Sequence, residues 1–166
     1  MHDLPKAHFA GSAAELLSPA DLASMTGLDF IRGMAEGRLP APPICEAMNF
    51  RLEDVAEGRA VFVGIAEFRH YNPIGTVHGG WVGTMLDSCM ACAVQTTLAA
   101  GRGYTTLEFK VNIVRPIFES TGPLRAIGTV SHSGRRTAVA EGRLEAPAGT
   151  LFATGSTTCL VMDLRA

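Results

Sequence analysis

The chain has 166 residues, which is enough for one domain with a single hydrophobic core. Hydrophobic residues make up 47% of it and charged residues 18%, so its composition is that of an ordinary globular protein with somewhat more apolar surface than usual. An oligomer interface would account for that surface. The formal net charge is -2 at pH 7, from 14 basic and 16 acidic side chains, which excludes nucleic acid as an expected partner.

The cysteines and the first residues of the chain favour a cytoplasmic location. Cys45, Cys89, Cys92 and Cys159 are scattered through a chain that should not need disulfides. Cys89 and Cys92 form a C-x-x-C without a second ligand pair, which is typical of core residues and not of a zinc or redox site. The opening "MHDLPKAHFAGSAAELLSPADL" lacks the basic start and apolar run of a signal peptide. We expect a cytoplasmic protein without a metal, a redox cofactor or a membrane partner.

Residues 1–43 predict an N-terminal extension, a poorly ordered tail followed by two short helices. Ser18-Pro19 is an N-cap with proline in the first turn, which predicts a helix over residues 20–25. In "GLDFIRGMAEG" the apolar side chains recur every three residues, which predicts a second helix that ends at "LPAPPI". We expect both helices to pack against a sheet.

Residues 44–166 predict the main domain. From Met48 two strand-like runs meet at the Glu57-Gly58 turn and form a hairpin. The next segment, from Gly79 to Gly101, is apolar nearly all round and predicts a long helix buried inside the fold. Three further runs, "YTTLEFKVNIVRP", "LRAIGTVSHSGRRTAVAEGRLEA" and "TLFATGSTTCLVM", predict four strands, because the second run folds back at Ser133-Gly134. The expected architecture is α+β, a mostly antiparallel sheet curled around one helix.

The first of these runs alternates in polarity. Leu107, Phe109, Val111 and Ile113 alternate with Glu108, Lys110 and Asn112. Such alternation predicts a strand with one dry face and one wetter face.

Asp87 is the residue of the predicted central helix that needs an explanation. It lies two to three turns inside an apolar segment, and an ionised carboxylate is seldom fully buried without a partner. One reading is structural, a hydrogen bond from a Ser or Thr side chain across a packed interface. The other is chemical, because a carboxylate in a cleft serves as nucleophile or general base.

The start of the same helix, His78-Gly79-Gly80, favours the chemical reading. Two residues without Cβ let the free amides of the first helical turn approach a ligand closely, and a helix N-terminus attracts a polarised carbonyl oxygen. A polarising amide and a carboxylate are the minimum apparatus for acyl transfer to water. Asp87 is about eight residues beyond the start, roughly 12 Å along the axis, so two chains related by a twofold axis are needed to join them.

This pattern resembles the hotdog-fold acyl-CoA thioesterases, and within them the phenylacetate-pathway (PaaI-like) branch. The similarity rests on His78-Gly79-Gly80, on Asn72 before it, on Asp87 after it and on "TTLEFKVNIVRP", and it extends over residues 27–162. It implies a hotdog fold and a homodimer, or a dimer of dimers (a homotetramer). The implied activity is hydrolysis of an aromatic or short- to medium-chain acyl-CoA to the free acid and coenzyme A.

The resemblance also implies roles for individual residues. The Gly79 amide would polarise the thioester carbonyl, and Asp87 of the other chain would be nucleophile or general base. Asn72 would orient the thioester or the attacking water, and His78 would support the loop and could contact the substrate. Thr106 matches a hydroxyl that holds the hydrolytic water in some relatives.

Other residues are weaker candidates for substrate contact. Gly80 adjoins the polarising amide, and Trp81 would help to set the depth of the acyl pocket. Four cations would suit the phosphates of coenzyme A. These are Arg102, Lys110, Arg135 and Arg136.

Two alternatives stay open. A non-catalytic acyl-CoA binder or sensor would use the same helix start, although a carboxylate beside the carbonyl gives a pure binder no advantage. A hotdog enzyme that acts on acyl carrier protein thioesters, or a related dehydratase, is the other; the segment around His78 lacks the pattern of a dehydratase histidine.

Overall fold

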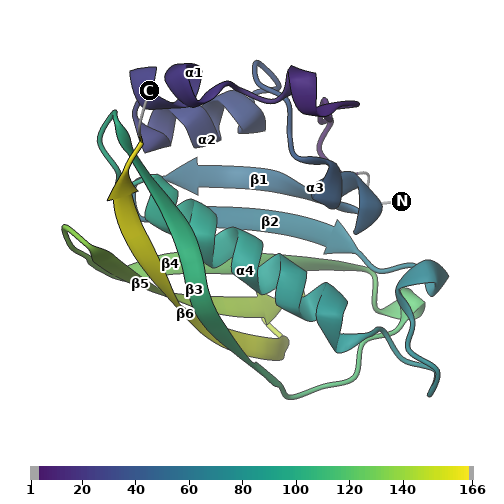
Figure 1. Cartoon of the computed structure of the whole chain (residues 1–166). Coiled ribbons are helices and arrows are strands. Elements are labelled where there is room, and N and C mark those ends of the chain that lie inside the picture. Colours follow the sequence, from purple (N-terminus) through teal and green to yellow (C-terminus); the bar gives the residue numbers. More distant parts are fainter. Residues whose placement is uncertain (1–3, 165–166) are drawn as a thin grey trace.

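The computed structural model describes residues 4–164, and within them a curled six-stranded antiparallel sheet wraps around one long helix (Figure 1). The strand order is β1-β2-β4-β5-β6-β3. This confirms the predicted α+β architecture. The helices are α1 (Pro19–Ser24), α2 (Gly27–Ala35), α3 (Pro43–Ala47) and α4 (Gly79–Gln95). The strands are β1 (Phe50–Ala56), β2 (Arg59–Ile65), β3 (Arg102–Ile113), β4 (Pro123–Ser133), β5 (Thr137–Glu145) and β6 (Leu151–Asp163).

The N-terminal extension is more ordered than expected. Ser18 caps α1 by accepting the amide of Asp21, as its sequence predicted. The described part of the tail before it, from residue 4, is held to the extension, because Phe9 forms a parallel bridge with Ala41 and Ala10 is only 4% exposed. The expected tail also includes residues 1–3, which lie outside the described residues. Helix α3 was not predicted; the prolines of "LPAPPI" end one helix, and Pro43 begins another. Among the described helices, none is long and apolar enough to cross a membrane.

A row of glycines lets α4 lie close to the sheet. Gly128, Gly142 and Gly155 are paired with one another across β4, β5 and β6. A Cβ atom on Gly128 would overlap the backbone oxygen of Cys89 in α4, and one on Gly142 would lie 2.9 Å from Cγ of Met90. The row is therefore a shallow groove that holds the helix, and it allows the close approach of α4 to the sheet.

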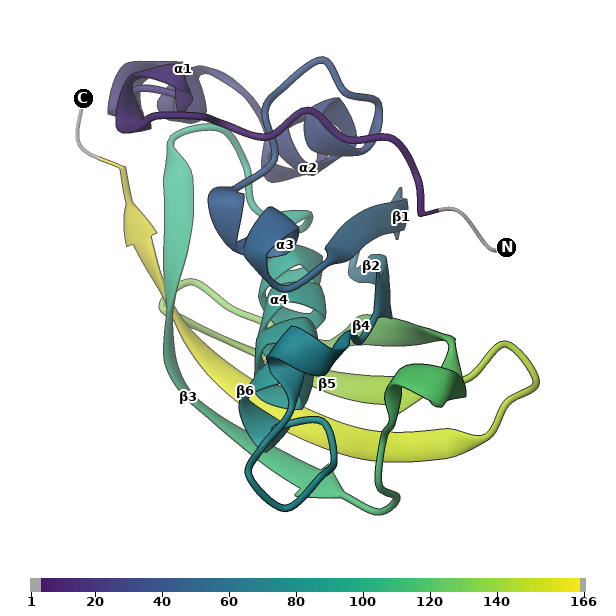
Figure 2. The same cartoon turned by 90° about the vertical axis from the view of Figure 1, so that its right-hand side faces the viewer.

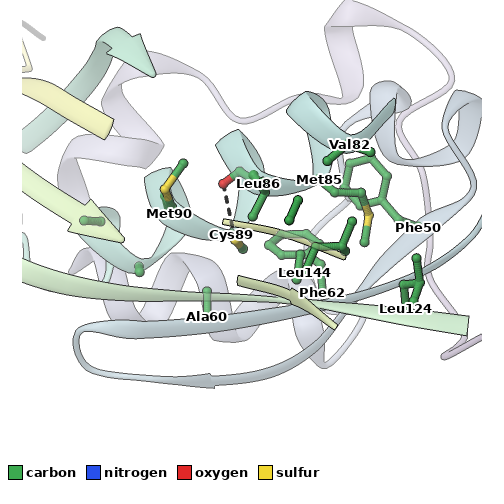
Figure 3. Close-up of a cluster of buried hydrophobic side chains, with 14 of the residues drawn as sticks. Phe50, Ala60, Phe62, Val82, Met85, Leu86, Cys89, Met90, Leu124 and Leu144 are labelled. Atoms are coloured by element: carbon green, nitrogen blue, oxygen red, sulfur yellow. Dashed lines mark hydrogen bonds between the residues drawn. The ribbon is translucent and has the colours of Figure 1, made fainter. Parts of the chain in front are cut away.

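The core fills the space between α4 and the concave face of the sheet. Figure 3 shows Met85, Leu86 and Met90 of the helix against Phe50 and other side chains of the strands. Ten of the 17 residues of α4 are buried, which confirms a largely internal helix. It ends at Gln95, before the predicted Gly101. Its remaining side chains, including Asp87 and Ser88, lie on a partly open flank.

Strand β3 differs from the prediction. Its alternating apolar side chains were expected to form a dry face, yet Leu107 is 57%, Phe109 46% and Ile113 49% exposed. Two features explain this: β3 is an edge strand, and a register shift between Thr106 and Glu108 interrupts its pairing with β6. The Phe109 ring lies against the flank of α4, 3.4 Å from where a Cβ on Gly83 would be. One chain alone therefore does not cover this face.

Candidate active site

Asp87 is half-buried on α4 and faces β3. The hydroxyl of Thr106 donates a hydrogen bond to Oδ1 of Asp87 at 3.1 Å. Burial raises the pKa of Asp87 above its usual range, and the hydrogen bond from Thr106 opposes that rise. The partner is a threonine, as the structural reading of this carboxylate expected, but the bond occupies only one oxygen of a side chain that also lines a cavity.

The N-terminus of α4 leaves one amide free. His78 caps the helix, since its Nδ1 accepts the amide of Gly80 at 2.8 Å and its carbonyl accepts the amide of Trp81 at 3.0 Å. Within residues 4–164 no acceptor faces the amide of Gly79, which is exposed at the positive end of the helix. Gly79 thus offers a donor to a carbonyl oxygen, whereas the amide of Gly80, also a candidate, is already used.

Asn72 shapes the loop that precedes this helix. Its Oδ1 accepts the amides of Ile74 at 3.0 Å and Thr76 at 3.2 Å, and its Nδ2 donates to the Thr76 hydroxyl at 2.8 Å. The side chain is thus occupied within the turn. In this chain Asn72 holds the loop, and a direct contact with the thioester or with water would require these bonds to change.

His70 is a second support for this loop, and no pattern in the sequence indicated that role. It is buried; its Nδ1 accepts the amide of Glu67 at 2.9 Å, and its Nε2 lies 3.2 Å from the carbonyl of Ala47. Its backbone carbonyl accepts the amide of His78 at 2.8 Å. His70 therefore connects the loop before α4 to α3, which positions the Gly79 amide from a distance.

A cavity of about 200 Å³ opens beside Asp87. Helix α4 and β3 supply one wall, which includes Thr106, Tyr104 and Cys92, and the N-terminal extension supplies another. Trp81 is not in this lining. It is 1% exposed, and its indole donates to the Met48 carbonyl at 2.7 Å, so the expectation that Trp81 sets the pocket depth is wrong: it is a core residue that anchors α4.

The four cations expected near coenzyme A phosphates do not form one cluster. Arg102 pairs with Asp163 at 2.8 Å and also donates to the carbonyl of Arg135 at 2.5 Å, so the β4–β5 turn and the start of β3 lie together. Arg135 and Arg136 are exposed in that turn. Lys110 lines a separate hollow formed by β3 to β6. Contact of these four residues with the phosphates of coenzyme A stays a prediction.

The two reactive groups are separated within one chain. Gly79 is the first residue of α4 and Asp87 lies eight residues further on, roughly 12 Å along the axis. A single carbonyl cannot contact both. Within the described residues no three His, Cys, Asp or Glu side chains gather as metal ligands do. An amide donor and a carboxylate on separate chains can together activate a carbonyl towards water.

The chain is similar to known proteins over the part that carries these groups. Residues 74–153 match the family model "Thioesterase superfamily". A phenylacetic acid degradation-related protein from Ralstonia eutropha is 29% identical, with a TM-score of 0.71 over 79% of this chain and 98% of that one. The phenylacetic acid degradation protein PaaI from Thermus thermophilus, solved as a mutant, is 28% identical, with a TM-score of 0.64 over 71% and 97%.

A third structure has the same fold at lower sequence identity. Thioesterase HI1161 from Haemophilus influenzae shares the fold at 20% identity, with a TM-score of 0.68 over 74% of this chain and 85% of that one. No curated protein sequence matches the chain.

Proposed function

We propose that the chain, whose fold and sequence are similar to the PaaI-like branch of the thioesterase superfamily, is a hotdog-fold thioester hydrolase that converts an acyl-CoA to the free acid and coenzyme A. The observation that carries the proposal is Asp87, half-buried beside a cavity and bonded through only one oxygen. The acyl group is aromatic or of short to medium length. Four free thiols support a reducing, cytoplasmic setting.

The proposed chemistry needs only groups of the protein and water. The Gly79 amide of one chain donates to the thioester oxygen and stabilises the negative charge that develops there. Asp87 of the other chain then attacks the carbonyl carbon, or takes a proton from the water that attacks it. The C–S bond breaks, and the thiolate of coenzyme A leaves and is protonated. In the first route water then hydrolyses the acyl-aspartate. Neither route uses a metal or a redox cofactor.

We place the second chain at the edge strand β3. This strand has 12 residues, and no other described strand pairs with its free edge. A long exposed edge with apolar side chains is a surface on which another strand adds. A twofold axis there would place two α4 helices side by side and build two identical sites, each from Gly79 of one chain and Asp87 of its partner. A homodimer is the catalytic unit, and a tetramer would be a pair of such dimers.

Complementation between two inactive variants tests this arrangement. Gly79→Pro removes the amide hydrogen at the first helical position, where proline is well tolerated, and Asp87→Asn removes the carboxylate. Each variant alone should lose at least about two orders of magnitude in kcat. Mixed and allowed to exchange subunits, they should recover roughly a quarter of wild-type activity, because half the dimers contain one intact site. The measurement is thiol release from phenylacetyl-, benzoyl- and hexanoyl-CoA.

Gly79→Ala is the matched control because it keeps the amide hydrogen. Its Cβ would lie 3.3 Å from the end of the flexible Ile113 side chain, so it should retain most activity. Activity of Asp87→Asn equal to wild type would refute the proposal. No recovery in the mixture would refute the shared site and leave the thioesterase in place. Hexanoyl carrier protein, assayed in parallel, tests the carrier-protein alternative, which faster release than from hexanoyl-CoA would favour.

A further inference from the structure

The N-terminal segment Leu4–Ala10 is attached to the body of the protein. It crosses α2 and ends near β1, as Figure 2 shows. The amide of Ala10 donates to the carbonyl of Ala41 at 3.1 Å, and the amide of Ala41 donates to the carbonyl of His8 at 2.7 Å. Phe9, between them, packs against the hydrophobic core. The segment therefore has a defined position.

Arg51 of β1 fixes the ring of Phe9. Its guanidinium carbon lies 4.3 Å from the centroid of the Phe9 ring, a cation–π contact. Nη1 of the same guanidinium donates to the carbonyls of Cys45 at 3.1 Å and Phe50 at 2.8 Å. Since these bonds fix Arg51 to the junction of α3 and β1, Phe9 is clamped against the sheet.

Phe9 lines the cavity that contains Asp87. Met34 of α2 and Ala41 belong to the same wall, to which Lys6, Ala7, Ala35 and Pro42 of the extension also contribute. Asp87 and Thr106 belong to the wall formed by α4 and β3. The cavity of about 200 Å³ is slightly larger than one of roughly 150 Å³ that holds benzene. It has room for one ring or a short chain. The wall formed by the extension precedes residue 74, outside the part that matches the thioesterase family.

We propose that Phe9 is the end wall of the acyl site and restricts the substrate to thioesters with one aromatic ring or a short aliphatic chain. The inference rests on the proposed function, because it assigns the cavity beside Asp87 to the acyl group. The clamp by Arg51 and Ala41 makes the wall rigid enough to exclude a longer chain, since a pocket rejects extra methylenes only where its wall cannot move. The extension is thereby a specificity element and not a cover for the sheet alone.

The test is the dependence of kcat/KM on acyl length for wild type and Phe9→Ala, with butyryl- to dodecanoyl-CoA and phenylacetyl-CoA. Wild type should favour hexanoyl- and phenylacetyl-CoA. Phe9→Ala should raise the ratio of kcat/KM for decanoyl- to hexanoyl-CoA by at least about tenfold, because the excluded methylenes then enter the space of the ring. Phe9→Leu should give a smaller shift in the same direction, and it keeps the site testable if the alanine variant folds poorly.

Phe30→Ala is the matched control, a phenylalanine of α2 that does not line the cavity. It should leave the ratio unchanged, and a ratio does not depend on the folded fraction. Release with an identical length profile in wild type, Phe9→Ala and Phe9→Leu would overturn this inference and leave the thioesterase standing. Efficient wild-type release from dodecanoyl-CoA would overturn it too. Absence of release from every acyl-CoA would refute the proposed function, and this inference with it.

Discussion

The two edge strands of the sheet, β1 and β3, differ in length, in cover and in exposed apolar surface. β1 is short and carries charge, with Glu53 paired to Arg125 at 2.7 Å and Asp54 paired to Arg59. Helices α2 and α3 pack beside it, as Figure 1 shows. β3 is nearly twice as long and exposes Leu107, Phe109 and Ile113. Charges, a cover and short length are the usual protection of an edge. β3 carries Glu108 and Lys110, but it is long and leaves three large apolar side chains exposed.

The difference between the covered edge β1 and the exposed edge β3 suggests a separate role for each side of α4. On the β1 side the chain supplies its own cover, and that cover encloses the cavity beside Asp87. On the β3 side it leaves apolar surface next to the free amide of Gly79, where the second chain of the proposed dimer would complete the site. In the proposed arrangement, one chain selects the acyl group and two chains form the catalytic site.

A charged substitution on each edge strand in turn tests whether β3, and not β1, is the interface between chains. Phe109→Asp should convert the protein to monomers, because an unpaired carboxylate would otherwise be buried between two apolar surfaces. Activity should fall by roughly a hundredfold or more, since the monomer has no Gly79 amide opposite its Asp87. Analytical ultracentrifugation and thiol release measure the two effects on the same sample.

The matched change on the other edge is Val55→Asp in β1. Val55 is partly buried on a strand that the chain covers itself, so this variant should keep the mass and the activity of wild type apart from some loss of stability. A dimeric, active Phe109→Asp would show that β3 is not the interface. Dissociation by both changes would show that the two edges are equivalent.

The glycine row lies between the two edges and determines how closely α4 packs against the sheet. Gly128→Ala would force a methyl group against the backbone of Cys89, which cannot rotate away. We expect a loss of about 1–3 kcal/mol in the free energy of unfolding, or more, from overpacking. Urea denaturation measures it. Gly11→Ala is the control: it meets only the flexible Glu15 side chain at 3.4 Å and should change stability by less than about 0.5 kcal/mol.

Most of the fold followed from periodicity and turn residues. The hairpin at Glu57-Gly58, the cap at Ser18 and the reversal at Ser133-Gly134 depend on local chemistry, which a sequence displays directly. Helix α3 did not follow, because prolines that end one helix also favour the start of another. The exposure of Phe109 did not follow either, since alternation identifies an apolar face but not the chain that covers it.

The candidate site was predictable only in part. Asp87 and Gly79 follow from motif and spacing, and Thr106 from the resemblance to the family; the structure brings Asp87 and Thr106 into contact. Phe9 and Arg51 could not be found, because their contact joins residues far apart in the sequence and leaves no local pattern. Trp81 was misplaced for the opposite reason: it is next to the motif, but helical rotation turns it into the core.

The smallest expected effect concerns the hydrogen bond at Asp87. Thr106→Val removes the donor that lowers the pKa of this carboxyl and leaves the burial that raises it, so the pKa should rise further. Because the ionised form is the nucleophile or base, the acid limb of the profile of kcat/KM against pH should move to higher pH. Well above that limb the variant should retain activity within about tenfold of wild type.

Thr106→Ser keeps the donor and should leave the acid limb in place. Loss of activity at every pH in the valine variant, without movement of the limb, would instead assign the hydroxyl to the attacking water.

The stability of the protein supplies an independent check. A carboxyl whose pKa is raised by folding stabilises the fold below its unfolded pKa, and that stabilisation is lost as pH rises through the folded pKa. The valine variant should lose it over a wider pH range than wild type, because its folded pKa lies higher, and Asp87→Asn should abolish the dependence in both backgrounds.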